Sequence, residues 1–339
     1  MTERSSRLVP TVATAAAVVV LLTMAAGVWL WSGLVRPRTP AETELEIAEG
    51  ASVTAVAERL AEVGVAPSPR ASRLYIAVRA DGRAPRYGRY RFPAGTRPWQ
   101  ALEQVLDGRV AMFEVTLIEG LTADETGEVF VAAGVGDPST WARLVGDPRP
   151  VADLAPRAAS LEGFLFPDTY RFAVGIDARR VIATLVDEFE AVWRDLDRRP
   201  DSRWGSVDEV VTLASLVEAE TSLEAERQRV AGVFLNRLDR GMLLQCDPTV
   251  VYALKRRDEW TGRLLRLHWQ LDDPYNTYRY PGLPPGPINS PGRAALAAAL
   301  DPESHDFLYF VARPEGGHTF SRTLAEHNRA VARLRRARR

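Results

Sequence analysis

Two glutamates, Glu218 and Glu220, stand at the end of a helix predicted over residues 206–220. At about 100° per residue, Glu220 falls on the same face as the apolar Leu213, whereas Glu218 points toward the polar side. A carboxyl group packed against apolar surface resists ionisation, so its pKa rises. Cleavage of a glycosidic bond needs a carboxylic acid that still holds its proton near neutral pH. The pattern therefore indicates Glu220 as a general acid, and pairing of Glu220 with an arginine such as Arg227 is the alternative.

Residues that could hold a sugar follow in two loops after this helix. Amides can hydrogen-bond to the hydroxyl and N-acetyl groups of sugars, and flat rings can pack against sugar C–H faces. Four residues fit this description and are the predicted substrate-binding residues: Gln245, Tyr275, Asn276 and Tyr278. A purely structural role within the loops is the alternative for each. Asp247 is the candidate second carboxylate, unless it caps the helix predicted to begin there.

Capping patterns predict where several helices begin. Residues 122–125 (Thr-Ala-Asp-Glu) and 206–209 (Ser-Val-Asp-Glu) both have the spacing of a capping box. Ser222 is expected to cap a helix over residues 223–239, and Asp247, followed by a proline, fits the N-cap of the next helix.

An apolar stretch lies near the N-terminus, where residues 8–35 contain no charged side chain. About 20 apolar residues span a bilayer core, so we expect a transmembrane helix over residues 11–35 after a short cytoplasmic segment, residues 1–10. Trp29 and Trp31 stand near one end, where indole rings favour the membrane–water boundary. A cleaved signal peptide is the alternative.

The remaining chain predicts an α+β protein in two parts. Residues 36–110 read as a linker followed by strand, helix, helix and strand, with alternation at 44–47 and 87–92. This order fits a small LysM-like subdomain. Residues 111–339 are then a mixed α+β catalytic domain that carries the glutamate on a helix.

Composition excludes several classes of function. The net charge is −1 and no basic stripe is present, so a nucleic-acid partner is not expected. Cys246 is the sole cysteine, which rules out an intramolecular disulfide. The 4 histidines lack metal-ligand spacing alongside acids, so neither a metal nor another cofactor is predicted, although His318 and His327 could support the site.

Taken together, the motifs resemble the endolytic murein transglycosylases, the MltG or YceG-like family. The resemblance covers the chain from the apolar segment to Asn328 and is most specific from Leu213 onward. The segment 214–221, Ala-Ser-Leu-Val-Glu-Ala-Glu-Thr, corresponds to the family's glutamate motif, with Ala219 in place of a common lysine. The segment 244–249, Leu-Gln-Cys-Asp-Pro-Thr, corresponds to a second motif in which Cys246 replaces threonine.

The resemblance implies that Glu220 is the catalytic residue and that peptidoglycan glycan strands are the substrate. It implies cleavage between N-acetylmuramic acid and N-acetylglucosamine that leaves 1,6-anhydro-muramic acid ends and terminates nascent strands. It also implies a LysM-like subdomain near the membrane, a single-pass protein of the cell membrane with its catalytic domain on the extracytoplasmic side, and peptidoglycan synthases as candidate partners.

Three alternatives stay open from the sequence. The chain could be a wall-binding protein without activity, or a hydrolase in which a second carboxylate activates water. It could also act as a tethered interaction module through residues 44–110.

Overall fold

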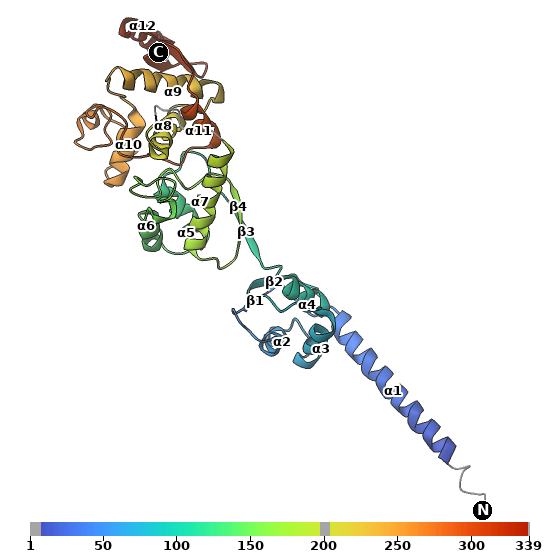
Figure 1. The fold of residues 1–339 in the computed structure, drawn as a ribbon. Coiled ribbons are helices and arrows are strands. Elements are labelled where there is room, and N and C mark those ends of the chain that lie inside the picture. Colours follow the sequence, from blue (N-terminus) through green and yellow to red (C-terminus); the bar gives the residue numbers. More distant parts are fainter. Residues whose placement is uncertain (1–7, 197–203, 338–339) are drawn as a thin grey trace, which may run out of the picture. The chain divides into compact units, whose positions relative to one another are not determined.

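The computed structural model describes residues 8–196 and 204–337 of the chain. Two compact units are present (Figure 1). Unit 1 comprises Met1–Phe113 with Arg171–Gly175, and unit 2 comprises Glu114–Tyr170 with Ile176–Arg339. The structure is thus a mixed α+β protein, as the sequence predicts.

Unit 1 opens with one long helix, α1 (Leu8–Val35). Its segment Thr14–Val35 is long and apolar enough to cross a membrane, as judged by length and composition. The structure therefore contains the N-terminal apolar helix that the sequence predicts.

The rest of unit 1 runs strand, helix, helix, strand, helix: β1 (Thr43–Ile47), α2 (Val53–Glu62), α3 (Pro69–Arg79), β2 (Gly88–Phe92) and α4 (Pro98–Asp107). β1 and β2 pair antiparallel, with Leu45 opposite Tyr90. Both of these side chains are buried, as the alternating pattern predicts. The hydroxyl of Ser52 accepts a hydrogen bond from Ala55 N and caps α2.

Unit 2 contains most of the helices. Its elements, beginning with the strand that starts in unit 1, are β3 (Met112–Thr116), α5 (Ala123–Ala132), α6 (Pro138–Val145), η1 (Arg149–Val151), β4 (Thr169–Ala173), α7 (Ala178–Asp195), α8 (Val207–Glu220), α9 (Glu224–Asp239), α10 (Asp247–Arg256), η2 (Arg266–Gln270), α11 (Arg293–Leu300), β5 (Tyr309–Ala312), β6 (His318–Ser321) and α12 (Leu324–Ala337). β3 pairs with β4, and β5 pairs antiparallel with β6. At the start of α5, Thr122 and Glu125 form the predicted capping box.

α8 is the central helix of this unit, and its environment differs from the prediction. All eight residues Val210–Val217 are buried, because α9, α10 and α11 pack against α8 (Figure 1). The expected division of α8 into one apolar and one polar face is therefore wrong. A helical wheel drawn from one helix takes no account of neighbours that cover its second face.

Three predicted helix caps near α8 are also wrong. The Ser206 hydroxyl accepts from Arg157, and Glu209 accepts from Gly205 N at 2.7 Å, so no capping box forms. α9 begins at Glu224, and the hydroxyl that bonds to Leu223 N is that of Thr221 rather than Ser222. Asp247 is the first residue of α10, whose N-cap position is Cys246.

Candidate active site

The two glutamates at the end of α8 have different partners. Glu218 was expected in solvent, but its side chain is only 6% exposed and forms an ion pair with Arg227 at 2.8 Å. Its other oxygen accepts from Gly292 N at 3.0 Å. Arg227, the arginine considered as a partner of Glu220, is thus paired with Glu218. Both oxygens of Glu218 are occupied by protein donors.

Glu220 is partly exposed at the last position of α8. Burial is the largest influence on its carboxyl group and raises its pKa, and the charge of Asp247 adds to this. A hydrogen bond with the Cys246 thiol and positive charge at His318 and Arg237 oppose the rise without cancelling it. The carboxyl is therefore biased toward its protonated form, which is the state a general acid needs.

The turn that carries Cys246 is held against the second loop by Thr277. Thr277 O accepts from Gln245 N at 3.1 Å, and its hydroxyl accepts from Cys246 N at 3.0 Å. The Thr249 hydroxyl lies 2.9 Å from the Thr277 hydroxyl. These buried bonds bring together two motifs that are about 30 residues apart in the sequence.

Arg237 of α9 supports the same turn from the other side. Its guanidinium donates to Leu244 O at 2.8 Å and to Leu308 O at 2.7 Å, so it connects the turn to the start of β5. Gln245 has a φ of 52°, a backbone conformation that is uncommon for residues other than glycine. Its side chain is exposed, as expected for a residue that contacts a ligand.

Asp247 anchors two aromatic rings beside this turn. Its Oδ1 accepts from Tyr278 OH at 2.7 Å and from Trp269 Nε1 at 3.0 Å. The two rings stack on each other with centroids 5.2 Å apart. Asp247 therefore holds the two rings in place through its hydrogen bonds. We call these two residues the Trp269–Tyr278 pair.

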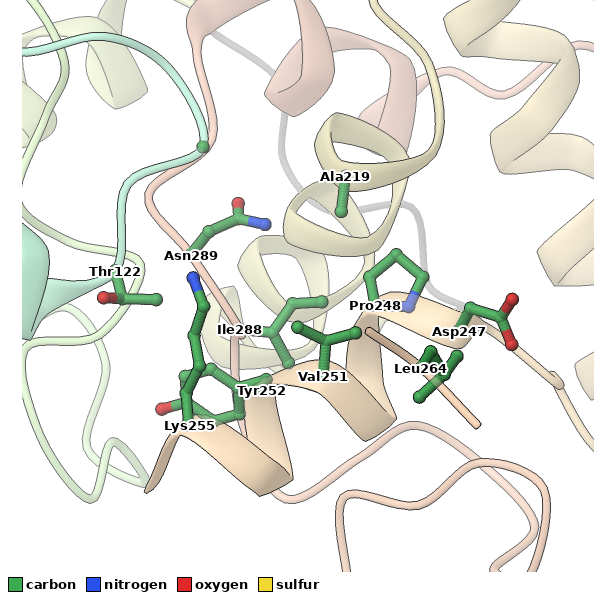
Figure 2. A pocket seen from close by; sticks show the side chains of 11 residues that line it. Thr122, Ala219, Asp247, Pro248, Val251, Tyr252, Lys255, Leu264, Ile288 and Asn289 are labelled. Atoms are coloured by element: carbon green, nitrogen blue, oxygen red, sulfur yellow. The ribbon is translucent and has the colours of Figure 1, made fainter. Parts of the chain in front are cut away.

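A pocket opens next to the end of α8 (Figure 2). Ala219, Asp247 and Pro248 form one part of its lining, and Tyr252 and Asn289 form another. Glu220 follows Ala219 directly, although it is not itself a lining residue. Asp247, which holds the Trp269–Tyr278 pair, is thus also part of the pocket lining.

The other predicted binding residues have different environments. Asn276 is fully buried, and its amide group donates to Trp269 O at 3.0 Å and to Leu271 O at 2.7 Å. These bonds favour the structural alternative for Asn276. Tyr275 packs against Tyr252 with ring centroids 4.9 Å apart and lines a separate hollow that contains Glu162.

Glu162 is a third buried carboxyl, and burial raises its pKa to about 8. Its two oxygens accept from Ala123 N at 3.0 Å and from Tyr252 OH at 3.1 Å, so it connects the start of α5 to α10. Like Glu218, Glu162 is engaged with protein donors. The hydrogen-bond partner of Glu220, by contrast, is the Cys246 thiol, which is a weak donor.

Sequence reasoning missed two features of the site. Trp269 lies in the short 3-10 helix η2, which has no periodic sequence pattern, and its only sequence signal was an isolated indole near two tyrosines. His318 was named as a supporting residue without a partner. Its Nδ1 lies 2.7 Å from Glu226, which also accepts from the His318 main-chain N at 3.0 Å. Within residues 8–196 and 204–337, no cluster of His, Cys, Asp and Glu could hold a metal ion.

Comparisons with known proteins identify relatives of this chain. A protein from Bacillus subtilis (strain 168) named "Endolytic murein transglycosylase" is 30% identical over 307 residues, which are 84% of this chain and 83% of that protein. A protein of the same name from Streptococcus pneumoniae serotype 2 is 34% identical over 222 residues, 63% of this chain and 38% of that protein.

A solved structure and a family model support membership of the same family. The crystal structure of a yceG-like protein from Listeria monocytogenes matches with a TM-score of 0.57 and 30% identity, and the match covers 85% of this chain and 98% of that one. The model of the YceG-like family matches residues 45–333. The family predicted from the motifs is confirmed, and this chain belongs to the YceG-like family.

Proposed function

We propose that this chain is a lytic transglycosylase that cuts peptidoglycan glycan strands endolytically, with Glu220 as the catalytic residue. The observation that carries the proposal is the state of Glu220, a carboxyl group with a raised pKa at the last position of α8, next in sequence to the pocket-lining Ala219. The names of the relatives from Bacillus subtilis and Streptococcus pneumoniae support the same reaction and substrate.

The reaction needs one carboxyl group that acts twice. Glu220 gives its proton to the oxygen between N-acetylmuramic acid and N-acetylglucosamine, and the bond from that oxygen to the muramic acid C1 breaks. The C6 hydroxyl oxygen of the same muramic acid then bonds to C1, and its proton passes to the Glu220 carboxylate. The product is a 1,6-anhydro ring, and Glu220 has regained its proton.

The environment of Asp247 supports this one-carboxyl scheme over a hydrolase. A hydrolase that activates water would use a second carboxylate as its base. In this site Asp247 Oδ1 already accepts two hydrogen bonds from Trp269 and Tyr278. We infer that Asp247 positions these rings for the glycan, and that Gln245 and Tyr278 contact it. Tyr275 lines a separate hollow, so we infer that it contacts the glycan strand farther from the bond that is cut.

The N-terminal unit indicates where the protein acts and how the chain is divided into domains. We infer that α1 anchors the chain in the cell membrane and that the catalytic unit lies on the extracytoplasmic side, where the substrate is found. The β1-α2-α3-β2 order supports a LysM-like subdomain for residues 36–110, and residues 111–339 would form the catalytic domain. Termination of nascent strands and contact with peptidoglycan synthases follow from this placement as further proposals.

Replacement of Glu220 by glutamine tests the catalytic role. Because glutamine cannot donate the required proton, Glu220→Gln should lower the release of glycan fragments from purified peptidoglycan by at least about 100-fold. Mass spectrometry of the soluble products measures this release. Glu218→Gln is the matched control, since it is two positions away and is already paired with Arg227. If Glu220→Gln kept the rate and Glu218→Gln lost it, the assignment would be reversed.

The Cys246 thiol should influence the pH at which activity declines. Its hydrogen bond lowers the pKa of Glu220, so Cys246→Ala should raise that pKa. Activity requires protonated Glu220 and falls as the pH passes its pKa, so the alkaline limb of kcat/KM should move to higher pH. Cys246→Thr restores a donor and should bring the limb back. Identical limbs in all three proteins would show that the thiol has no such influence.

The Trp269–Tyr278 pair should contribute to glycan binding. Loss of a stacked ring costs about 0.5–1.5 kcal/mol beyond its buried area, so Trp269→Ala should weaken binding of glycan oligomers by about three- to tenfold or more. Calorimetry in the Glu220→Gln background measures this without turnover. Trp269→Phe keeps a ring and should retain most of the affinity. Trp193→Ala, which alters a tryptophan stacked on Phe189 in α7, is the control. Unchanged affinity in Trp269→Ala would rule out a role for the pair.

A further inference from the structure

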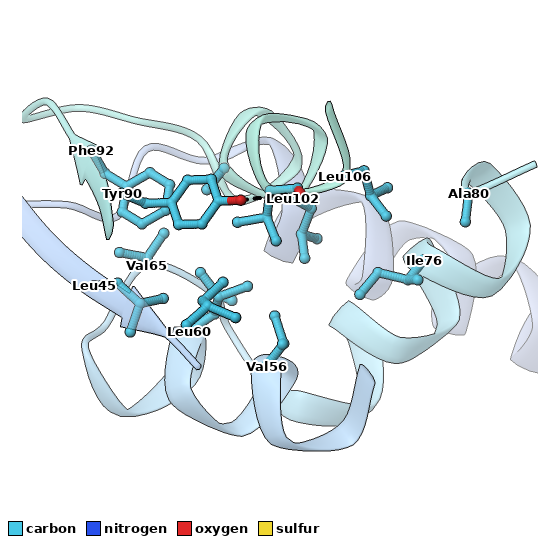
Figure 3. Close-up of a cluster of buried hydrophobic side chains, with 14 residues drawn as sticks. Leu45, Val56, Leu60, Val65, Ile76, Ala80, Tyr90, Phe92, Leu102 and Leu106 are labelled. Carbon is cyan, nitrogen blue, oxygen red and sulfur yellow. Dashed lines mark hydrogen bonds between the residues drawn. The ribbon is translucent and has the colours of Figure 1, made fainter. Parts of the chain in front are cut away.

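An apolar face of α3 is left uncovered within unit 1. Leu74 and Val78, one helical turn apart, are 50% and 71% exposed. The opposite side of α3 faces the core, where Ile76 and Ala80 are buried (Figure 3). Exposed apolar residues that gather on one helix face usually mark an interaction site.

This face of α3 lies beside the end of α1. Gly27, Trp31 and Leu34 of α1 line one hollow together with Leu74 and Val78 of α3. A Cβ atom on Gly33 would lie 3.5 Å from the Pro67 side chain, just before α3 begins. The apolar face is therefore continuous with the surface of the predicted anchor.

The length of α1 indicates the depth of this contact. α1 has 28 residues, which corresponds to about 42 Å at about 1.5 Å per residue. The hydrocarbon core of a bilayer takes up about 20 residues, and the apolar segment Thr14–Val35 has 22, so the C-terminal end of α1 lies near the boundary of the core. The last two turns of α1 therefore approach the headgroup layer. Trp29 and Trp31, 68% and 71% exposed, are in these turns, where indole rings are favoured.

The charges on α3 match the same environment. Arg70, Arg73 and Arg79 are exposed on α3, and the helix contains no acidic residue. Arg79 pairs with Glu103 of α4 at 3.8 Å, so Arg70 and Arg73 are the arginines that we consider for contact with lipid. Basic residues near an anionic membrane surface are attracted to it. Apolar and basic side chains together on an exposed helix are typical of helices that lie in the membrane interface.

We propose that α3 rests on the bilayer surface beside α1, with Leu74 and Val78 in the interfacial layer and Arg70 and Arg73 among anionic phospholipid headgroups. The inference depends on α1 being a membrane span and not on the catalytic role of Glu220. Such a contact gives unit 1 two attachments to the membrane, and therefore a fixed orientation that one helix alone would not provide.

Lipid quenching in the full-length chain tests this proposal. Val78→Cys carries an environment-sensitive fluorophore, and the protein is reconstituted into vesicles of phosphatidylcholine and phosphatidylglycerol. Cys246 is buried and does not compete for the label. We expect blue-shifted emission that lipids with a nitroxide near the headgroup quench strongly. Glu58→Cys on α2, an exposed position, is the control and should resemble a label in water.

A third label distinguishes the ways in which the proposal could fail. Val20→Cys in α1 should be quenched by nitroxides deep in the bilayer if the span is inserted. Quenching at position 20 with water-like emission at position 78 would overturn the α3 contact while leaving the anchor intact. Blue-shifted emission at position 78 without lipid quenching would also overturn it, since protein rather than lipid would then cover the face.

Discussion

The packing of α8 on all sides is the constraint on which the site depends. Because α9, α10 and α11 surround residues 210–217, the end of α8 cannot shift without disturbing three neighbours. Glu218 forms an ion pair with Arg227 through one carboxylate oxygen and accepts a hydrogen bond from Gly292 N through the other. It thereby connects the end of α8 to both residues. Glu220, two positions later, emerges at the edge of the packed region. The same burial that stabilises the helix raises the pKa of Glu220.

The loops around Glu220 are positioned by hydrogen bonds of four polar side chains, those of Thr277, Arg237, Asn276 and Asp247. Thr277 joins the turn at 245–249 to the second loop, and Arg237 fixes the same turn from α9. Asn276 holds the chain that presents Trp269, and Asp247 holds the two aromatic rings. A buried polar group that is fully bonded specifies one loop conformation, since any other arrangement leaves a donor or acceptor unpaired. The turn at 245–249 therefore connects Glu220, through Cys246, with the Trp269–Tyr278 pair, through Asp247.

Much of this arrangement could be predicted from the sequence, and the errors have physical causes. The helix at 206–220, the β1–β2 alternation and the Thr122 capping box were correct because they depend on local periodicity and on residues three positions apart. The expected solvent exposure of Glu218 was wrong because helices distant in sequence cover that side. Ser206 does not cap its helix because Arg157, 49 residues away, takes the hydroxyl. Trp269 was missed for the same reason, since its role arises only when η2 and α10 come together.

In the proposed mechanism Glu220 serves as acid and then as base, and no water molecule enters the product. Digestion of peptidoglycan in water enriched with oxygen-18, followed by mass spectrometry of the released fragments, tests this claim most directly. The account predicts muramic acid ends that lack the mass of one water and contain no oxygen-18. Ends with one added water that carries oxygen-18 would contradict it, because they would show that a second group had activated water for hydrolysis.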